Sequence, residues 1–178
     1  MINTNILSAR SYFIDLHDIE CNQKYDGKLP YSFHLNMVAK QAKLFEKYIP
    51  VDNPHNQDVW IGIYGHDSIE DARLTYNNIK ERFGEAAAEI IYLCTEDKGR
   101  NRTDRKSDVW YHQLKKNDLA VFVKLCDIIA NVKYSLLTNS SMFLKYKTEY
   151  NQKVKPHLYT EQYKEMFDYL DKLFTIKN

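Results

Sequence analysis

The sequence contains few of the residues on which all-β, disulfide-rich or membrane proteins depend. It has five glycines and four prolines in 178 residues, whereas a chain made of strands needs many such turn residues. Its three cysteines are odd in number and lack a C-x-x-C pair, which argues against a disulfide framework. No apolar run approaches the roughly 18 residues of a membrane-spanning helix. The 25 basic residues nearly balance the 24 acidic ones, and the resulting net charge of +1 is too small to attract nucleic acid.

The residues that are abundant indicate a soluble chain with a substantial core. Apolar residues make up 44% of the chain and aromatic residues 13%, and this length suits a single domain. The first thirteen or so residues lack the basic, apolar and small-residue regions of a signal peptide. We therefore expect one domain over residues 1–178, located in the cytoplasm as a monomer or homodimer, with no membrane or nucleic-acid partner.

Apolar residues recur at helical spacing along almost the whole chain, and no segment alternates as a strand does. This predicts an all-α fold, a compact bundle of about eight or nine helices. The longest helix is expected from Asp118, as its N-cap, to Leu137, and the last over about 161–175. A charged amphipathic helix is expected over Asp104–Leu114. The segments Cys21–Pro30 and Glu96–Arg105 are expected to be irregular.

Four ionisable residues stand where the helical pattern predicts buried positions. His34 begins one apolar helix, His66 and Asp67 end another, and Asp127 lies in the middle of a third. Alone, each has an ordinary structural explanation, such as a cap or a buried ion pair. A desolvated carboxylate nevertheless costs several kcal/mol unless a cation compensates it. Together, two imidazoles and two carboxylates form the nitrogen and oxygen ligand set that suits manganese, iron, zinc or another first-row divalent ion.

Three further polar residues fall near this group. Glu70 and Asp71 follow His66 and Asp67 by three to five residues, so they can lie over the same end of a helix. Carboxylates placed beside a metal can orient or deprotonate a water molecule. Asn131 follows Asp127 by four residues, on the same helical face, where its amide can hold a substrate.

These residues resemble the HD superfamily of metal-dependent phosphohydrolases, named for its His-Asp doublet. The sequence is most similar to the hydrolase domain of RelA/SpoT proteins and to the stand-alone small alarmone hydrolases, which include metazoan SpoT homologues. The matching pieces are Pro30–His34, His66–Asp71 and Val123–Asn131, with a short helix over Ile79–Gly84 between them. The resemblance covers about residues 5–155.

The resemblance implies removal of pyrophosphate from the 3′ position of guanosine tetra- or pentaphosphate, with Mn²⁺ or another first-row divalent ion as cofactor. By motif position, the metal ligands are His34, His66, Asp67 and Asp127. Glu70 and Asp71 position and activate the attacking water. The residues implied to contact the nucleotide are Asn131, Lys24, Tyr31, Lys124, Arg105 and Lys106.

The sequence departs from the family pattern at two places. Leu35 replaces the proline that commonly follows the first histidine, which removes a preferred helix-opening residue. Gln23-Lys24 stands where relatives often have an Arg-Lys pair that helps to hold the purine. Without the arginine, a planar and bidentate stacking group is lost, so base selectivity stays open.

Two other functions fit the same residues. An HD-type phosphatase with this site could act on the 2′-phosphate of NADPH or on a nucleoside 5′-monophosphate, and it would release orthophosphate instead of pyrophosphate. A nucleotide-binding module without turnover is the second alternative, and it predicts binding with no product.

Overall fold

A computed structural model describes residues 4–49, 51 and 55–176. Within them lie nine α-helices of seven residues or more: α1 (Thr4–Asp15), α2 (Ser32–Leu44), α3 (Asn56–Gly65), α5 (Tyr76–Phe83), α6 (Glu85–Cys94), α8 (Asp108–Leu114), α9 (Asp118–Leu137), α10 (Met142–Glu149) and α12 (Lys164–Thr175). Three helices have four residues: α4 (Ser68–Asp71), α7 (Arg102–Arg105) and α11 (Lys155–Leu158). The all-α prediction is confirmed.

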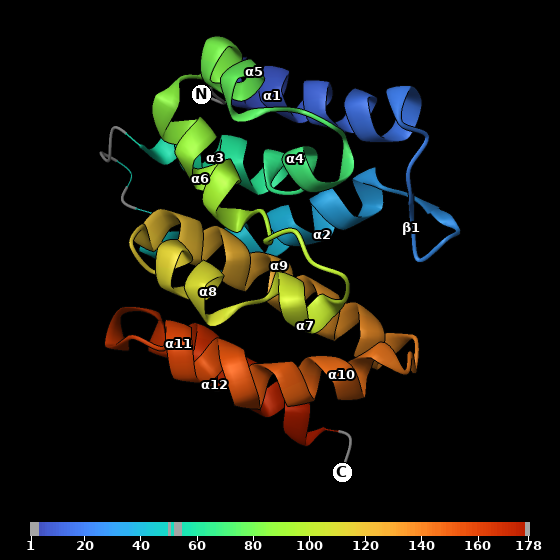
Figure 1. Ribbon diagram of the computed structural model, residues 1–178, viewed down its shortest axis with the longest axis vertical. Helices are drawn as coiled ribbons and strands as arrows, with labels where there is room; N and C mark the ends of the chain where they lie inside the picture. Colours follow the sequence, from blue (N-terminus) through green and yellow to red (C-terminus); the bar gives the residue numbers. More distant parts are fainter. Residues whose placement is uncertain (1–3, 50, 52–54, 177–178) are drawn as a thin grey trace.

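Helix α9 runs through the centre of the bundle. It contacts α2, α3 and α6 on one side and α10 and α12 on the other. Figure 1 shows this order, with α1 and α5 at one end of the molecule and the C-terminal helices at the opposite end. A residue in the middle of α9 is therefore surrounded by several helices.

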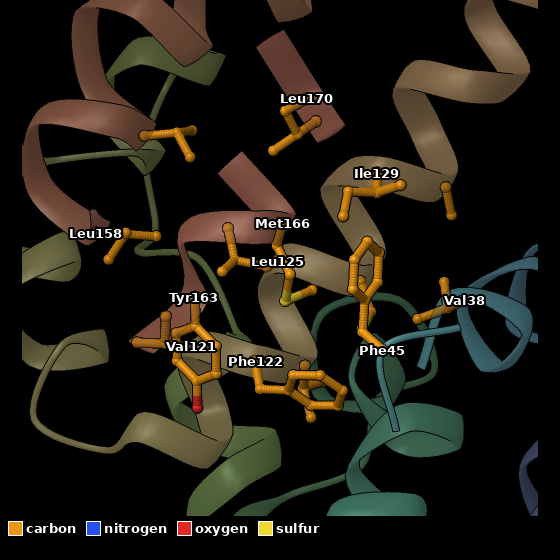
Figure 2. Packing of buried hydrophobic residues seen from close by; sticks show 14 of the residues in the cluster. Val38, Phe45, Val121, Phe122, Leu125, Ile129, Leu158, Tyr163, Met166 and Leu170 are labelled. Atoms are coloured by element: carbon orange, nitrogen blue, oxygen red, sulfur yellow. The ribbon is translucent and has the colours of Figure 1, made fainter. Parts of the chain in front are cut away.

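The apolar face of α9 forms much of the core with α2 and the C-terminal segment. Leu125 and Ile129 of α9 and Met166 and Leu170 of α12 are fully buried in one cluster. Figure 2 shows these side chains together with Val38 of α2. Burial of such side chains stabilises a fold by about 1.5–3 kcal/mol each. The predicted C-terminal helix thus uses its apolar face within the chain.

Two predicted helix boundaries were wrong. The N-cap of α9 is Asn117 instead of Asp118, because the Asn117 side chain accepts hydrogen bonds from the backbone of the next turn. The expected helix over Asp104–Leu114 is two helices, α7 and α8. The break occurs where Ser107 takes an extended conformation and caps α8 by accepting from the Trp110 N–H.

The first irregular segment contains a small β-hairpin. Strands β1 (Lys24–Tyr25) and β2 (Leu29–Pro30) pair antiparallel. The turn between them has positive φ at Asp26 and Gly27, 52° and 68°, and this Asp-Gly pair is favoured in tight hairpin turns. The hairpin protrudes beside the start of α2 (Figure 1).

The cysteines differ in their exposure. Cys94 and Cys126 are buried, Cys21 is exposed, and all three are free thiols. Over the part of the chain that is described, none of the helices combines the length and apolar character needed to span a bilayer.

Gly65, directly before His66, sits at a very close contact between helices. A Cβ there would lie 2.5 Å from the end of Ile91 and 2.6 Å from the ring of Phe13. We expect Gly65→Ala to lower the free energy of unfolding by about 1–3 kcal/mol, the usual cost of overpacking a core. Urea denaturation measures this directly. Since a glycine-to-alanine change inside an unhindered helix stabilises by about 0.5–1 kcal/mol, a gain in stability would contradict the predicted contact.

Candidate metal centre and active site

Three helices that contact one another bring the four predicted metal ligands together. His34 lies in the first turn of α2, His66 directly follows α3, Asp67 precedes α4, and Asp127 is in the middle of α9. Helices α2, α3 and α9 pack pairwise. His34, His66 and Asp127 are all buried, and their ligand atoms lie within 4.8 Å of one another.

The spacing of the ligand atoms fits a single small divalent ion. The Nε2 atoms of His34 and His66 are 3.2 Å apart. Asp67 Oδ2 lies 3.3 Å from the first and 2.9 Å from the second. Asp127 Oδ1 is 3.3 Å and 3.8 Å from the same two atoms. Ligands bonded at about 2.1 Å to one ion are separated by about 3.0–3.4 Å in octahedral or tetrahedral geometry, so these four side chains fit such an ion.

The orientation of both imidazoles is set by neighbouring groups. Nδ1 of His66 is 3.0 Å from the Ile63 carbonyl oxygen, which can only accept, so Nδ1 donates a proton to it and Nε2 is the atom turned toward the other ligands. The ring of Tyr25 stacks on that of His34 at 4.9 Å, nearly parallel. The rings of His34 and His66 thus turn their Nε2 atoms toward the same point.

Asp127 is held ionised by a lysine on its own helix and by the two histidines. Lys124 Nζ lies 3.2 Å from Asp127 Oδ2, although Lys124 is only 4% exposed. The Asn131 amide donates to Asp127 Oδ1 at 2.5 Å, and it accepts in turn from the Tyr25 hydroxyl at 2.8 Å. Burial by itself raises the pKa of Asp127, but Lys124 and the two histidines outweigh it and lower that pKa well below its ordinary value. The carboxylate is therefore available as a ligand.

Metal binding should release a proton from His34. Burial alone lowers the pKa of His34, but the carboxylates of Asp127 and Asp67 outweigh it and raise the pKa to about 9. At pH 7 the metal-free ring is therefore protonated, and a metal must displace that proton to reach Nε2. We expect the affinity for Mn²⁺ to rise by up to about tenfold per pH unit toward pH 9.

Titration calorimetry in buffers of different ionisation enthalpy measures this release, which should be close to one proton at pH 7. His112→Gln, which alters an exposed histidine of α8, is the matched control and should leave the release unchanged. An affinity for Mn²⁺ that did not depend on pH would contradict the prediction.

The acidic residues Glu70 and Asp71 lie beside the ligands. The Tyr31 hydroxyl is 2.6 Å from Asp67 Oδ2 and 3.0 Å from Asp71 Oδ2, so a single phenol lies between the two carboxylates. Glu70 is 25% exposed and accepts from Arg105 at 2.9 Å. Partial burial and the nearby charge of Glu96 raise the pKa of Glu70 above its ordinary value, which brings that carboxylate closer to a useful proton acceptor.

A cavity of about 180 Å³ opens at this site. Of the predicted site residues, all but His66 and Lys24 line it. His66 lies behind the other ligands and is 1% exposed. Lys24 is exposed and does not line the cavity. Because side chains alternate along β1, its neighbour Tyr25 lines the cavity instead.

The basic side chains of the cavity are already paired with carboxylates. Lys106 contacts both Glu96 and Glu149. Arg102 donates to Glu149 at 2.8 Å, and Arg105 pairs with Glu70. A polyanionic ligand must therefore compete with these carboxylates for the cations.

The sequence interpretation missed several of these lining residues. Tyr25 could have been found, because the Asp26-Gly27 turn predicts a hairpin whose residues alternate in direction. Glu96 and Glu149 carry no local signal, since each is defined only by contacts to residues distant in sequence.

Comparison with known proteins supplies a structural match. No known family profile and no curated protein sequence matches the chain. Among solved structures, it is similar to a metazoan ortholog of SpoT that hydrolyses ppGpp and plays a role in starvation responses. The TM-score is 0.79 at 18% sequence identity, over 100% of this chain and 98% of that one. The two chains share one fold. This agrees with the fold that the sequence resemblance implied.

Proposed function

We propose that this chain is a metal-dependent phosphohydrolase that removes the 3′-pyrophosphate of guanosine tetra- or pentaphosphate. The observation that carries the proposal is the convergence of His34, His66, Asp67 and Asp127 at a cavity that also holds two acidic and several basic side chains. The fold shared with a protein described as hydrolysing ppGpp supports this substrate.

The four ligands would hold Mn²⁺ or a similar divalent ion, which supplies a Lewis acid and lowers the pKa of water. Glu70 accepts the proton of the attacking water, because its pKa is raised and its carboxylate borders the cavity. Asp71, which lines the same cavity, orients that water. Arg105 can leave Glu70 and neutralise charge on the phosphates, where much of phosphoryl-transfer catalysis resides.

The size of the cavity indicates how a nucleotide would be accommodated. The 180 Å³ beside the ligands is below the roughly 300–1,000 Å³ of a usual ligand pocket. A second cavity, of about 570 Å³, shares Arg102, Lys106 and Glu149 with the first. The reacting pyrophosphate occupies the smaller space, and the rest of the nucleotide extends past these three side chains.

Pyrophosphate release from guanosine tetraphosphate tests the proposal. We expect release when Mn²⁺ is added and no release once it is chelated, with GDP as the second product. If protein shown to contain Mn²⁺ released nothing, the substrate would be wrong. Orthophosphate released from NADPH or a nucleoside 5′-monophosphate under the same conditions would assign one of the alternative phosphatase activities.

A further inference from the structure

A chain of hydrogen bonds connects Asp71 to a histidine buried behind the active site. Gln23 Nε2 donates to Asp71 Oδ2 at 2.9 Å, and Gln23 Oε1 lies 2.6 Å from His17 Nδ1. His17 is 0% exposed. None of these contacts was expected from the sequence, in which Gln23-Lys24 stands where relatives often have an Arg-Lys pair that helps to hold the purine.

The backbone brings Gln23 back onto His17. Residues Leu16–Glu20 form a single π-helical turn, and Asn22 has a positive φ of 44°. As a result the Gln23 N–H donates to the His17 carbonyl oxygen at 2.8 Å. Asp18 in the same turn accepts from the Ser32 N–H at the start of α2. Both ends of the hairpin are thus anchored, and the Gln23 side chain has a defined position.

The charges along the chain of bonds determine the orientation of the Gln23 amide. An ionised carboxylate only accepts hydrogen bonds, so Asp71 requires the NH₂ group of Gln23. The Gln23 oxygen then faces His17, and Nδ1 of His17 must carry the ring proton. Burial lowers the pKa of His17, and its Nε2 has no partner among the described residues. Both facts fit a neutral ring, because a buried charged ring would leave an N–H unpaired.

His17 supports Asp71 by a second route. Its ring stacks on Tyr31 at 4.6 Å with 17° between the planes. The Tyr31 hydroxyl lies 3.0 Å from Asp71 Oδ2, the same oxygen that accepts from Gln23. The Gln23 amide donates to this oxygen, and the Tyr31 hydroxyl, whose single proton is shared with Asp67 Oδ2 at 2.6 Å, lies beside it. Both of these partners contact His17, so together they restrict the rotation of the Asp71 carboxylate, although Asp71 itself is exposed.

We propose that Gln23 and His17 are positioning residues that hold Asp71 in the orientation needed to direct the attacking water. This inference rests on the proposed hydrolytic function of the site. It predicts that Gln23 acts on the rate of the chemical step, whereas a residue that held the purine would act on substrate affinity.

The test compares Gln23→Met, which keeps the length of the side chain, with His17→Phe, which keeps the stack on Tyr31. We expect Gln23→Met to lower kcat by about 10–100-fold, the usual effect of losing an orienting partner, with KM and Mn²⁺ affinity within about twofold of wild type. His17→Phe should lower kcat in the same direction. The double variant should be no slower than Gln23→Met, because the two residues act in series.

Cys21→Ala, an exposed neighbour in the same loop, is the matched control and should leave kcat unchanged. Nitrogen-15 spectra of the histidine rings provide a readout without catalysis: His17 should be neutral with its proton on Nδ1. If His17→Phe does not fold, the spectrum of the wild-type protein and the kinetics of Gln23→Met still test the inference. A raised KM with unchanged kcat in Gln23→Met, or a proton on Nε2 of His17, would overturn the inference. If the wild-type protein hydrolysed no nucleotide, the proposed function would fall, while the spectrum would still report on the bonding of His17.

Discussion

The variant Asp127→Asn should lose Mn²⁺-dependent hydrolysis by a factor on the order of 10³. The substitution keeps the size of the side chain but removes the negative charge that faces His34 and His66 at 3.3 Å and 3.8 Å. A bound metal contributes several kcal/mol to stabilising the charge of the transition state, and about 4 kcal/mol corresponds to this factor. The measurement is initial rate against Mn²⁺ concentration, together with the amount of metal bound.

The same substitution leaves Lys124 buried without its nearest counter-charge, so a loss of folding must be separated from a loss of the ligand. Breaking a buried ion pair by removing one partner destabilises by about 3–5 kcal/mol. The double variant Lys124→Met/Asp127→Asn removes the orphaned charge, and we expect it to regain much of the stability but none of the activity. An Asp127→Asn protein that bound one Mn²⁺ and retained full activity would contradict the assigned ligand set.

The second large effect is expected at Glu70. Glu70→Gln should lower kcat by about 10²–10⁴, the range for losing a general base, and should leave metal binding intact because Glu70 is not one of the four clustered ligands. Burial and the charge of Glu96 raise the pKa of Glu70. As the pH is lowered, the wild-type rate should therefore begin to fall at a pH above the ordinary pKa range of glutamate. That decline reflects protonation of the base as the pH falls through its raised pKa.

The pH profile of Glu70→Gln distinguishes the base from a residue that only pairs with Arg105. The variant should lose the acid-side decline that Glu70 causes, whereas Arg105→Gln should retain that decline with a weaker affinity for substrate. An unchanged pH profile in Glu70→Gln would assign the proton acceptor to another group, and Asp71 would then be the next residue to replace.

The helices, and the buried positions of three of the four candidate metal ligands, could be predicted from the sequence. Apolar residues repeat every three to four positions from Ile6 to Phe174, and this period requires helices that bury one face. His34, His66 and Asp127 interrupt that pattern at buried positions, where an ionisable group needs compensation. Each of these signals is local, so it is visible without knowledge of the neighbouring helices.

The surroundings of the ligands could not be predicted in the same way. Glu149 contacts Lys106 from 43 residues away, and Gln23 contacts Asp71 from 48 residues away. Such pairs depend on how α4, α7, α10 and the hairpin pack, and the spacing of residues along the chain does not contain that information. Lys24 shows the consequence: the resemblance implied a contact with the nucleotide, and the structure places Lys24 exposed and outside the cavity lining, whereas Tyr25, its neighbour in β1, lines the cavity.

The sequence by itself determined that this protein is helical and that His34, His66 and Asp127 occupy buried positions, because periodicity and the cost of burying charge act over single helices. Only the tertiary structure decided that the four candidate metal ligands converge on one point, that the basic residues of the cavity are already paired, and that a buried histidine is linked through Gln23 to Asp71. The physical reason is range: helix formation depends on neighbours three or four residues apart, whereas a site depends on side chains that only packing brings into contact.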